Sequence, residues 1–197
     1  CEELLIKYKD DDQVMLIGGN NFQNGILRGE GSYYFSQYPH IWGWASWRRA
    51  WQHYEYDIQG LGSFLETGIN TVFETDTEKK YWEKIFLKVS QGRANTWDYQ
   101  WVYAIWKNKG YSICPNVNLV INLGFRNSST HTFLRDSYRD NLKCEDIIFP
   151  MVHPLKKIEV KADLITFKNV YGKSLKRLIR LVRENNLIIL IKYYFKI

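Results

Sequence analysis

The sequence predicts an α/β protein with a small mixed sheet, followed by a basic amphipathic helix at the C-terminus. Three observations support this fold class: amphipathic helical segments alternate with short apolar strands, the connections are short, and basic residues gather near the C-terminus. The chain has 197 residues, of which 45% are apolar and 24% charged. Such a chain can bury a sizeable core, which excludes wholesale disorder.

The first elements are short. Residues 2–9 have the spacing of an amphipathic helix, and we expect them to form its last turns. Residues 14–17 are apolar and precede a glycine pair, which predicts a buried strand, and residues 33–36 predict a second strand. Three aspartates at 10–12 are expected to form a solvated loop, because a metal-binding aspartate pair normally ends a strand and this triplet precedes one.

The middle of the chain predicts helices. It turns helical from Trp47, and residues 78–90 place apolar side chains at helical spacing with lysine and glutamate opposite. Thr96 can cap a further helix over 97–109, which Gly110 would end.

Two strand segments are expected after that helix, at 111–114 and 117–121, around Pro115. Residues 122–158 are rich in loop-forming residues. The alternation of helix and strand with short connections is typical of an α/β layer. We divide the chain into a body over 1–158 and a C-terminal extension over 159–197.

The net charge of +6 belongs to the end of the chain. Residues 168–197 hold eight lysines and arginines against one acid, Glu184, whereas residues 1–167 hold 19 basic and 20 acidic residues. A nearly neutral body argues against a nucleic-acid partner. The three cysteines have no metal-binding spacing and form no closed disulfide framework, which favours a reducing compartment.

The extension has a basic face. Over 173–183, leucine, isoleucine and valine fall on one side of a helix and lysine and arginine on the other. Such a segment suits an anionic membrane surface, and we expect residues 173–197 to dock there. The alternative is a solvated helix that packs its apolar stripe on the body. No secretory signal or run of 18 apolar residues is present, so the expected location is cytoplasmic, at the inner membrane face.

Aromatic residues make up 16% of the chain and are densest over residues 33–51. Gly43, between Trp42 and Trp44, permits a backbone path that β-branched residues would resist and lets a ligand or another part of the chain approach closely. Indole rings offer apolar faces to the C–H groups of a sugar and a polar edge for hydrogen bonds.

Other residues of this segment could bind a ligand or stabilise the fold. Arg48 and Arg49 have the fork geometry that binds phosphate. Trp47 and Trp51 lie four residues apart on a predicted helix, so we expect both in the core. His40 suits a loop-holding role as well as contact with substrate.

Asp98 is a candidate general base. It lies near a helix start, flanked by Trp97 and Trp101. An acid in the first turn of a helix is also explained by the helix dipole, and the pattern does not choose between the two. His131 lies among hydroxyl residues and is either a single metal ligand or a loop hydrogen bonder.

Four segments resemble a known family. They are YFSQYPHIWGWASWRRAW at 34–51, TWDYQW at 96–101, PNVNLVINLGF at 115–125 and THT at 130–132. In this order they are similar to bacterial nucleotide-diphospho-sugar transferases of the hemolysin-like group, which have the GT-A fold. The resemblance covers roughly residues 1–155. The Gly43-Trp44 and Trp97-Asp98 pairs are more distantly similar to motifs of N-acetylglucosaminyltransferase I.

The resemblance implies an inverting transfer of a sugar from a nucleotide-sugar donor to a glycan or polysaccharide acceptor. It makes Asp98 the base that deprotonates the acceptor hydroxyl and His131 a ligand of a divalent metal, Mn or Mg. The segment of Trp42, Gly43 and Trp44 would cover donor sugar and acceptor. We add two neighbours, Trp97 and Arg48, to the expected substrate-binding residues.

The chain departs from this family in one respect. In those proteins a nucleotide-binding half precedes the helix that corresponds to residues 2–9. We therefore expect an incomplete GT-A-like domain that is inactive alone and that self-associates through an exposed sheet edge. The alternative function is a non-catalytic carbohydrate-binding or membrane-docked scaffold module. A nucleic-acid binder that uses the basic tail is a third.

Overall fold

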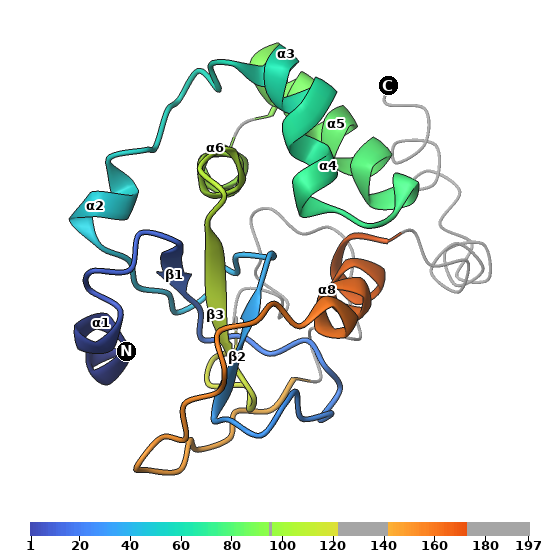
Figure 1. The fold of residues 1–197 in the computed structure, drawn as a ribbon. Coiled ribbons are helices and arrows are strands. Elements are labelled where there is room, and N and C mark those ends of the chain that lie inside the picture. The colour runs from blue at the N-terminus through green and yellow to red at the C-terminus, as the bar shows by residue number, and fades with distance from the viewer. Residues whose placement is uncertain (95, 122–141, 173–197) are drawn as a thin grey trace, which may run out of the picture.

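The computed structural model describes residues 1–94, 96–121 and 142–172, in which helices surround a three-stranded mixed sheet (Figure 1). The strands are β1 (Val14–Ile17), β2 (Tyr33–Ser36) and β3 (Tyr111–Pro115), in the order β1-β3-β2. β3 runs parallel to β1 and antiparallel to β2. The predicted α/β class with a small mixed sheet is confirmed.

All residues of the three strands are buried, so none of the strands alternates between buried and exposed side chains. Both outer strands have cover on their free edges. Ile17 of β1 exchanges two backbone hydrogen bonds of 2.9 Å with Ala45, and Phe35 of β2 forms a bridge with Ile158. These contacts leave less exposed edge than the sequence led us to expect.

The helices lie around the sheet. α6 leads directly into β3, α1 and α2 lie on the β1 side, and α8 lies on the β2 side (Figure 1). α3 and α4 are joined by a π-helical turn over Phe64–Gly68, and a second such turn, Phe167–Tyr171, continues α8. The bounds are α1 Glu2–Lys7, α2 Arg48–Trp51, α3 Leu61–Ser63, α4 Ile69–Val72, α5 Asp76–Ser90, α6 Asp98–Lys107 and α8 Val160–Thr166.

The ends of α6 differ from the prediction. The capping residue at its start is Trp97, not Thr96, although the Thr96 hydroxyl accepts a 3.4 Å hydrogen bond from the Asp98 N–H. At its other end the left-handed residue is Lys109, with φ of 55°, rather than Gly110. Gly110 is required for space, because a Cβ there would lie 2.3 Å from Sδ of Met15.

The strand predicted over 117–121 is wrong. Side-chain hydrogen bonds of Asn118 replace strand pairing there: its amide donates to the carbonyls of Val120 and Lys143 at 2.8 and 3.1 Å. Asn118 Oδ1 accepts the backbone N–H of Asn21 at 3.0 Å. The segment thereby passes close to the end of β1, where the Leu119 N–H reaches the carbonyl of Gly19.

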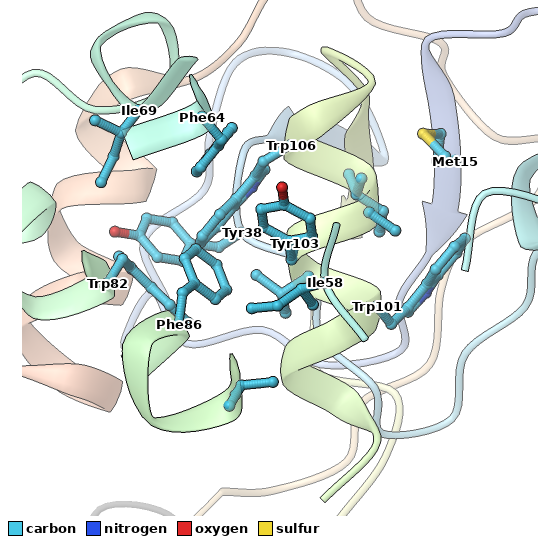
Figure 2. Packing of buried hydrophobic residues seen from close by; sticks show 14 of the residues in the cluster. Met15, Tyr38, Ile58, Phe64, Ile69, Trp82, Phe86, Trp101, Tyr103 and Trp106 are labelled. Carbon is cyan, nitrogen blue, oxygen red and sulfur yellow. The ribbon is translucent and has the colours of Figure 1, made fainter. Parts of the chain in front are cut away.

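The main core lies between α6 and the helices beyond it, α3, α4 and α5 (Figure 2). Trp82, Trp101 and Trp106 are fully buried in it. All six residues 101–106 are buried, so α6 is a central helix and not a surface helix with one apolar face. Rigid rings of this size bury much apolar area, which makes α6 a firm base for residues at its start.

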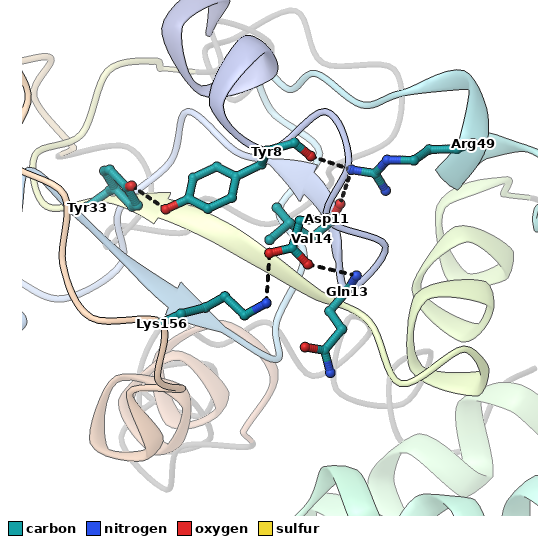
Figure 3. A network of polar contacts seen from close by, with 7 residues as sticks. All are labelled: Tyr8, Asp11, Gln13, Val14, Tyr33, Arg49 and Lys156. Atoms are coloured by element: carbon teal, nitrogen blue, oxygen red, sulfur yellow. Dashed lines mark hydrogen bonds and ion pairs between the residues drawn. The ribbon is translucent and has the colours of Figure 1, made fainter.

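Arg49 joins α2 to the connection between α1 and β1 (Figure 3). Its guanidinium donates to the carbonyls of Tyr8, Lys9 and Val14 at 2.8, 2.7 and 3.0 Å. The same group lies 4.5 Å from the ring centre of Trp47. Of the two arginines considered for phosphate binding, Arg49 is thus engaged in the fold, whereas Arg48 is exposed.

Residues 160–172, which our division assigns to the extension, pack on the body. The Gln23 amide donates to the Ala162 carbonyl and to Oγ1 of Thr166 at 3.1 and 2.9 Å, and Ser36 donates to Asp163 at 2.5 Å. The amphipathic segment expected to meet a membrane, 173–197, lies outside the described residues. Among the helices that the structure does describe, none has the length and apolar character to cross a bilayer.

Candidate functional site

A pocket of about 170 Å³ lies where the chain after β1 meets the start of α6. Segment 39–42 and the end of the turn that continues α8 complete its walls. Three residues singled out from the sequence, His40, Trp42 and Asp98, line it together. The lining residues are Asn20, Phe22, Pro39, His40, Ile41, Trp42, Asp98, Tyr99, Val102, Val170 and Tyr171.

Asp98 is the first residue of α6 and half-buried. Its Oδ1 accepts hydrogen bonds from the Thr96 hydroxyl and, at 3.0 Å, from the Tyr99 N–H. Its Oδ2 has no hydrogen-bond partner among the described residues. The two interpretations of Asp98 are therefore compatible: one oxygen is used in local structure at the helix start, and the other remains for a ligand.

Asn20 is a pocket residue that the sequence analysis missed. Its side chain is 1% exposed, and within the described ranges neither its Nδ2 nor its Oδ1 has a hydrogen-bond partner. An unsatisfied buried amide costs about 1–3 kcal/mol, so such a group is normally paired with protein, water or ligand. Its position after a buried strand and two glycines is the signal that could have found it.

The glycine pair lets the chain reach this position. A Cβ on Gly19 would lie 2.8 Å from the carbonyl oxygen of Gly43, so only glycine allows the two segments to touch. Gly43 itself has φ of +57°, and a Cβ on it would lie 2.5 Å from Cγ1 of Val120. Gly43 therefore permits a close approach between two segments of the backbone, as predicted. It does not line the pocket described above but a separate apolar cavity of about 680 Å³ near α1.

His40 is buried and forms part of the pocket wall. Its ring packs edge-on against Phe22 at 4.7 Å between centroids, and Phe22 lies 6.0 Å from the ring of Trp42. Both roles considered for His40 are compatible with this position, because the residue lines the pocket and its ring packs against Phe22.

Trp44 and Trp97 lie outside the pocket lining. Their rings stack on each other with centroids 5.7 Å apart, in a cluster that includes Trp51. The expectation that Trp51 belongs to the core is wrong, because its side chain is 41% exposed. Trp101 fills the core at this point, and Trp51 packs on it from outside, at 4.8 Å between centroids. Trp47 is half-buried, and its indole N–H donates to the Leu5 carbonyl at 2.9 Å.

The predicted metal ligand, His131, lies outside the described residues. Within 1–94, 96–121 and 142–172, no group of three or more histidine, cysteine, aspartate or glutamate side chains is placed to hold a metal ion. Arg48 begins α2, and its side chain makes no hydrogen bond or ion pair with the described residues. It lies three residues before Trp51, so both share one side of the helix.

A second polar cavity, of about 190 Å³, contains two buried carboxylates, Glu78 and Asp163. Glu78 accepts hydrogen bonds from the hydroxyls of Tyr38 and Thr75, at 2.8 and 2.7 Å. Burial raises the pKa of Asp163 to about 7, although its hydrogen bond from Ser36 acts in the opposite direction. These carboxylates join α5 and α8 to the end of β2.

Comparison with known proteins adds no further evidence: no protein-family model matches the chain, and neither a curated protein nor a solved structure is found to be similar to it. The function is therefore argued from the residues of the site and from the sequence motifs.

Proposed function

We propose that the pocket binds a sugar of a glycan acceptor and that the protein takes part in glycosyl transfer, with Asp98 as general base. One observation carries the proposal. An amide with two unsatisfied polar atoms, Asn20, and a carboxylate with one unengaged oxygen, Asp98, line the same small pocket. A sugar presents hydroxyls that both donate and accept, and the rings of Phe22 and Trp42 suit its C–H groups.

The proposed reaction is a single displacement. The acceptor hydroxyl oxygen forms a bond to the anomeric carbon of the donor sugar, while the bond from that carbon to the nucleotide diphosphate breaks. The attack comes from the face opposite the leaving diphosphate, so the configuration at the anomeric carbon inverts. The hydroxyl proton passes to the Asp98 carboxylate. Asn20 would orient the acceptor through a neighbouring hydroxyl.

The remaining parts of the proposal rest on the sequence. The resemblance of residues 34–51 and 96–101 to nucleotide-diphospho-sugar transferases supports a nucleotide-sugar donor. It also supports a divalent metal, Mn or Mg, that would neutralise the leaving diphosphate. The basic segment 173–197 supports work at the cytoplasmic face of a membrane.

The test is transfer by the natural protein purified from its source cells, with and without Asp98→Asn. Loss of one well-placed base lowers turnover by about 10²–10⁴-fold. Donor binding, measured by calorimetry, should stay the same because the amide keeps the size of the carboxylate. Asp12→Asn is the matched control, since Asp12 is an exposed aspartate in the loop before β1.

Unchanged turnover in the Asp98→Asn protein would refute the assignment of the base. A natural protein that binds glycans but shows no transfer with any nucleotide sugar would favour the alternative, a carbohydrate-binding or scaffold module.

A further inference from the structure

Four aromatic side chains form an exposed surface beside the pocket, which we call the aromatic platform: Trp44, Trp51, Tyr54 and Trp97. Trp51 and Trp97 are 41% and 43% exposed, and the other two are half-buried. Large aromatic rings are usually buried, so a group of them at the surface indicates a binding site.

The platform is held by its own packing. Trp51 and Tyr54 are stacked, with centroids 4.7 Å apart and an angle of 13° between their planes. Trp44 and Trp97 form a second stacked pair, and the buried Trp101 lies beneath Trp44 and Trp51, with centroids 6.3 and 4.8 Å away. Because these rings are braced before any ligand arrives, binding would cost little side-chain entropy.

The polar atoms of the platform distinguish a sugar from an apolar protein surface. The indole N–H groups of Trp47 and Trp106 donate to backbone carbonyls. In the part of the chain that the structure describes, the indole N–H groups of Trp44, Trp51 and Trp97 reach no protein acceptor. An apolar partner would leave these donors unsatisfied, whereas a sugar offers C–H groups to the ring faces and hydroxyl oxygens to the ring edges.

The platform adjoins the pocket along the chain at two points. Trp97 directly precedes Asp98, so their Cα atoms are about 3.8 Å apart. Trp42 lines the pocket and Trp44 belongs to the platform, with only Gly43 between them. Burial raises the pKa of Tyr54 in the platform, and the charges of Tyr56 and Asp98 raise it further, so Asp98 also lies close to the platform in space. A ligand that places a hydroxyl at Asp98 can therefore extend onto the platform.

We propose that the aromatic platform is a second sugar subsite, so that the acceptor is an oligosaccharide of at least two residues and not a single sugar. This inference rests on the proposed function, because it places the reacting sugar in the pocket and the next sugar on the platform.

The test measures binding rather than transfer. The probe is an array of defined oligosaccharides of two to six residues, each printed with its component monosaccharides, followed by calorimetric titration of the best oligosaccharide. We expect it to bind the 197-residue chain at least about tenfold more tightly than its monosaccharides. Trp51→Ala and Trp97→Ala should each remove most of that gain, while Asn20→Ala weakens binding of monosaccharide and oligosaccharide alike.

Tyr56→Ala is the matched control, since Tyr56 is an aromatic residue 74% exposed outside the platform, and it should leave both affinities unchanged. Thermal unfolding of each variant verifies that it folds. Trp97→Ala is the milder of the two changes, because Trp97 packs against fewer aromatic rings than Trp51. Equal affinity for oligosaccharide and monosaccharide, absence of binding to every glycan, or a gain that survives both tryptophan variants would overturn the inference.

The two proposals fail in different assays. If Asp98→Asn abolishes transfer but no length preference is found, the platform proposal is wrong and the proposed function stands. If oligosaccharides bind through the platform but Asp98→Asn transfers normally, the assigned base is wrong and the binding surface stands.

Discussion

Replacing Gly43 with alanine should destabilise the protein through two separable effects. A non-glycine residue in the left-handed region, here at φ of +57°, costs about 1–2 kcal/mol. The new Cβ would also lie 2.5 Å from Cγ1 of Val120, and such overpacking costs about 1–3 kcal/mol. The expected loss is about 2–5 kcal/mol in the free energy of unfolding, and urea denaturation followed by tryptophan fluorescence measures it.

A double-mutant cycle separates the two effects. Val120→Ala removes the methyl group that the new Cβ would meet but leaves the backbone strain at Gly43 unchanged. The double variant should therefore be about 1–3 kcal/mol more stable than the sum of the two single changes predicts. Strict additivity, or a cost of Gly43→Ala below about 1 kcal/mol, would refute the argument that this glycine is required by close packing.

Two further predictions concern charged side chains. Because the pKa of Asp163 is about 7 in the folded protein, the folded state keeps a proton that the unfolded chain releases near pH 4. This group should lower the free energy of unfolding by roughly 4 kcal/mol as the pH rises from 4 to 7. In Asp163→Asn the free energy of unfolding, measured by urea denaturation at each pH, should fall much less over this range. The same fall in the variant as in the original protein would contradict the raised pKa of Asp163. Arg49→Lys should cost about 1–3 kcal/mol in thermal unfolding, because a lysine ammonium is a single point and cannot reproduce the donors at Nε and Nη2 or the planar contact with Trp47, whereas Arg48→Lys should be neutral. Equal effects at 48 and 49 would refute that distinction.

The regular elements could be predicted because their signals are local. Residues 14–17 and 33–36 are short apolar runs between turn-forming residues, and both are strands. The predicted helix over 78–90 is α5, which begins two residues earlier because Thr75 caps it. The Thr75 hydroxyl accepts a hydrogen bond from the Glu78 N–H and donates one to the Glu78 carboxylate. Such signals depend on neighbours within one or two turns of the chain.

The environment of individual site residues was harder to predict, because it depends on distant segments. The spacing of Trp47 and Trp51 predicted a shared core position, but Trp101 from α6 already fills the core beneath Trp51. The position of Asn20 depends on the close approach of Gly19 to Gly43, and the sequence does not show that its buried amide lacks a partner. Asp98 could be found from the sequence because its motif is short. The sequence could not show that one oxygen of its carboxylate is hydrogen-bonded and the other is not.

The segment 42–44 connects the two parts of the proposed acceptor site. Trp42 lines the pocket, Trp44 belongs to the aromatic platform, and the left-handed conformation of Gly43 sets the direction of the chain between them. Val120 occupies the space in which a Cβ of residue 43 would lie, so only glycine fits at this position. The relative placement of the two proposed sugar subsites therefore depends on the close packing of Gly43 and Val120, which neither line the pocket nor belong to the platform. Because the contact joins the backbone of the segment to a neighbouring loop, a change there should disturb pocket and platform together, whereas loss of one platform ring should leave the pocket intact.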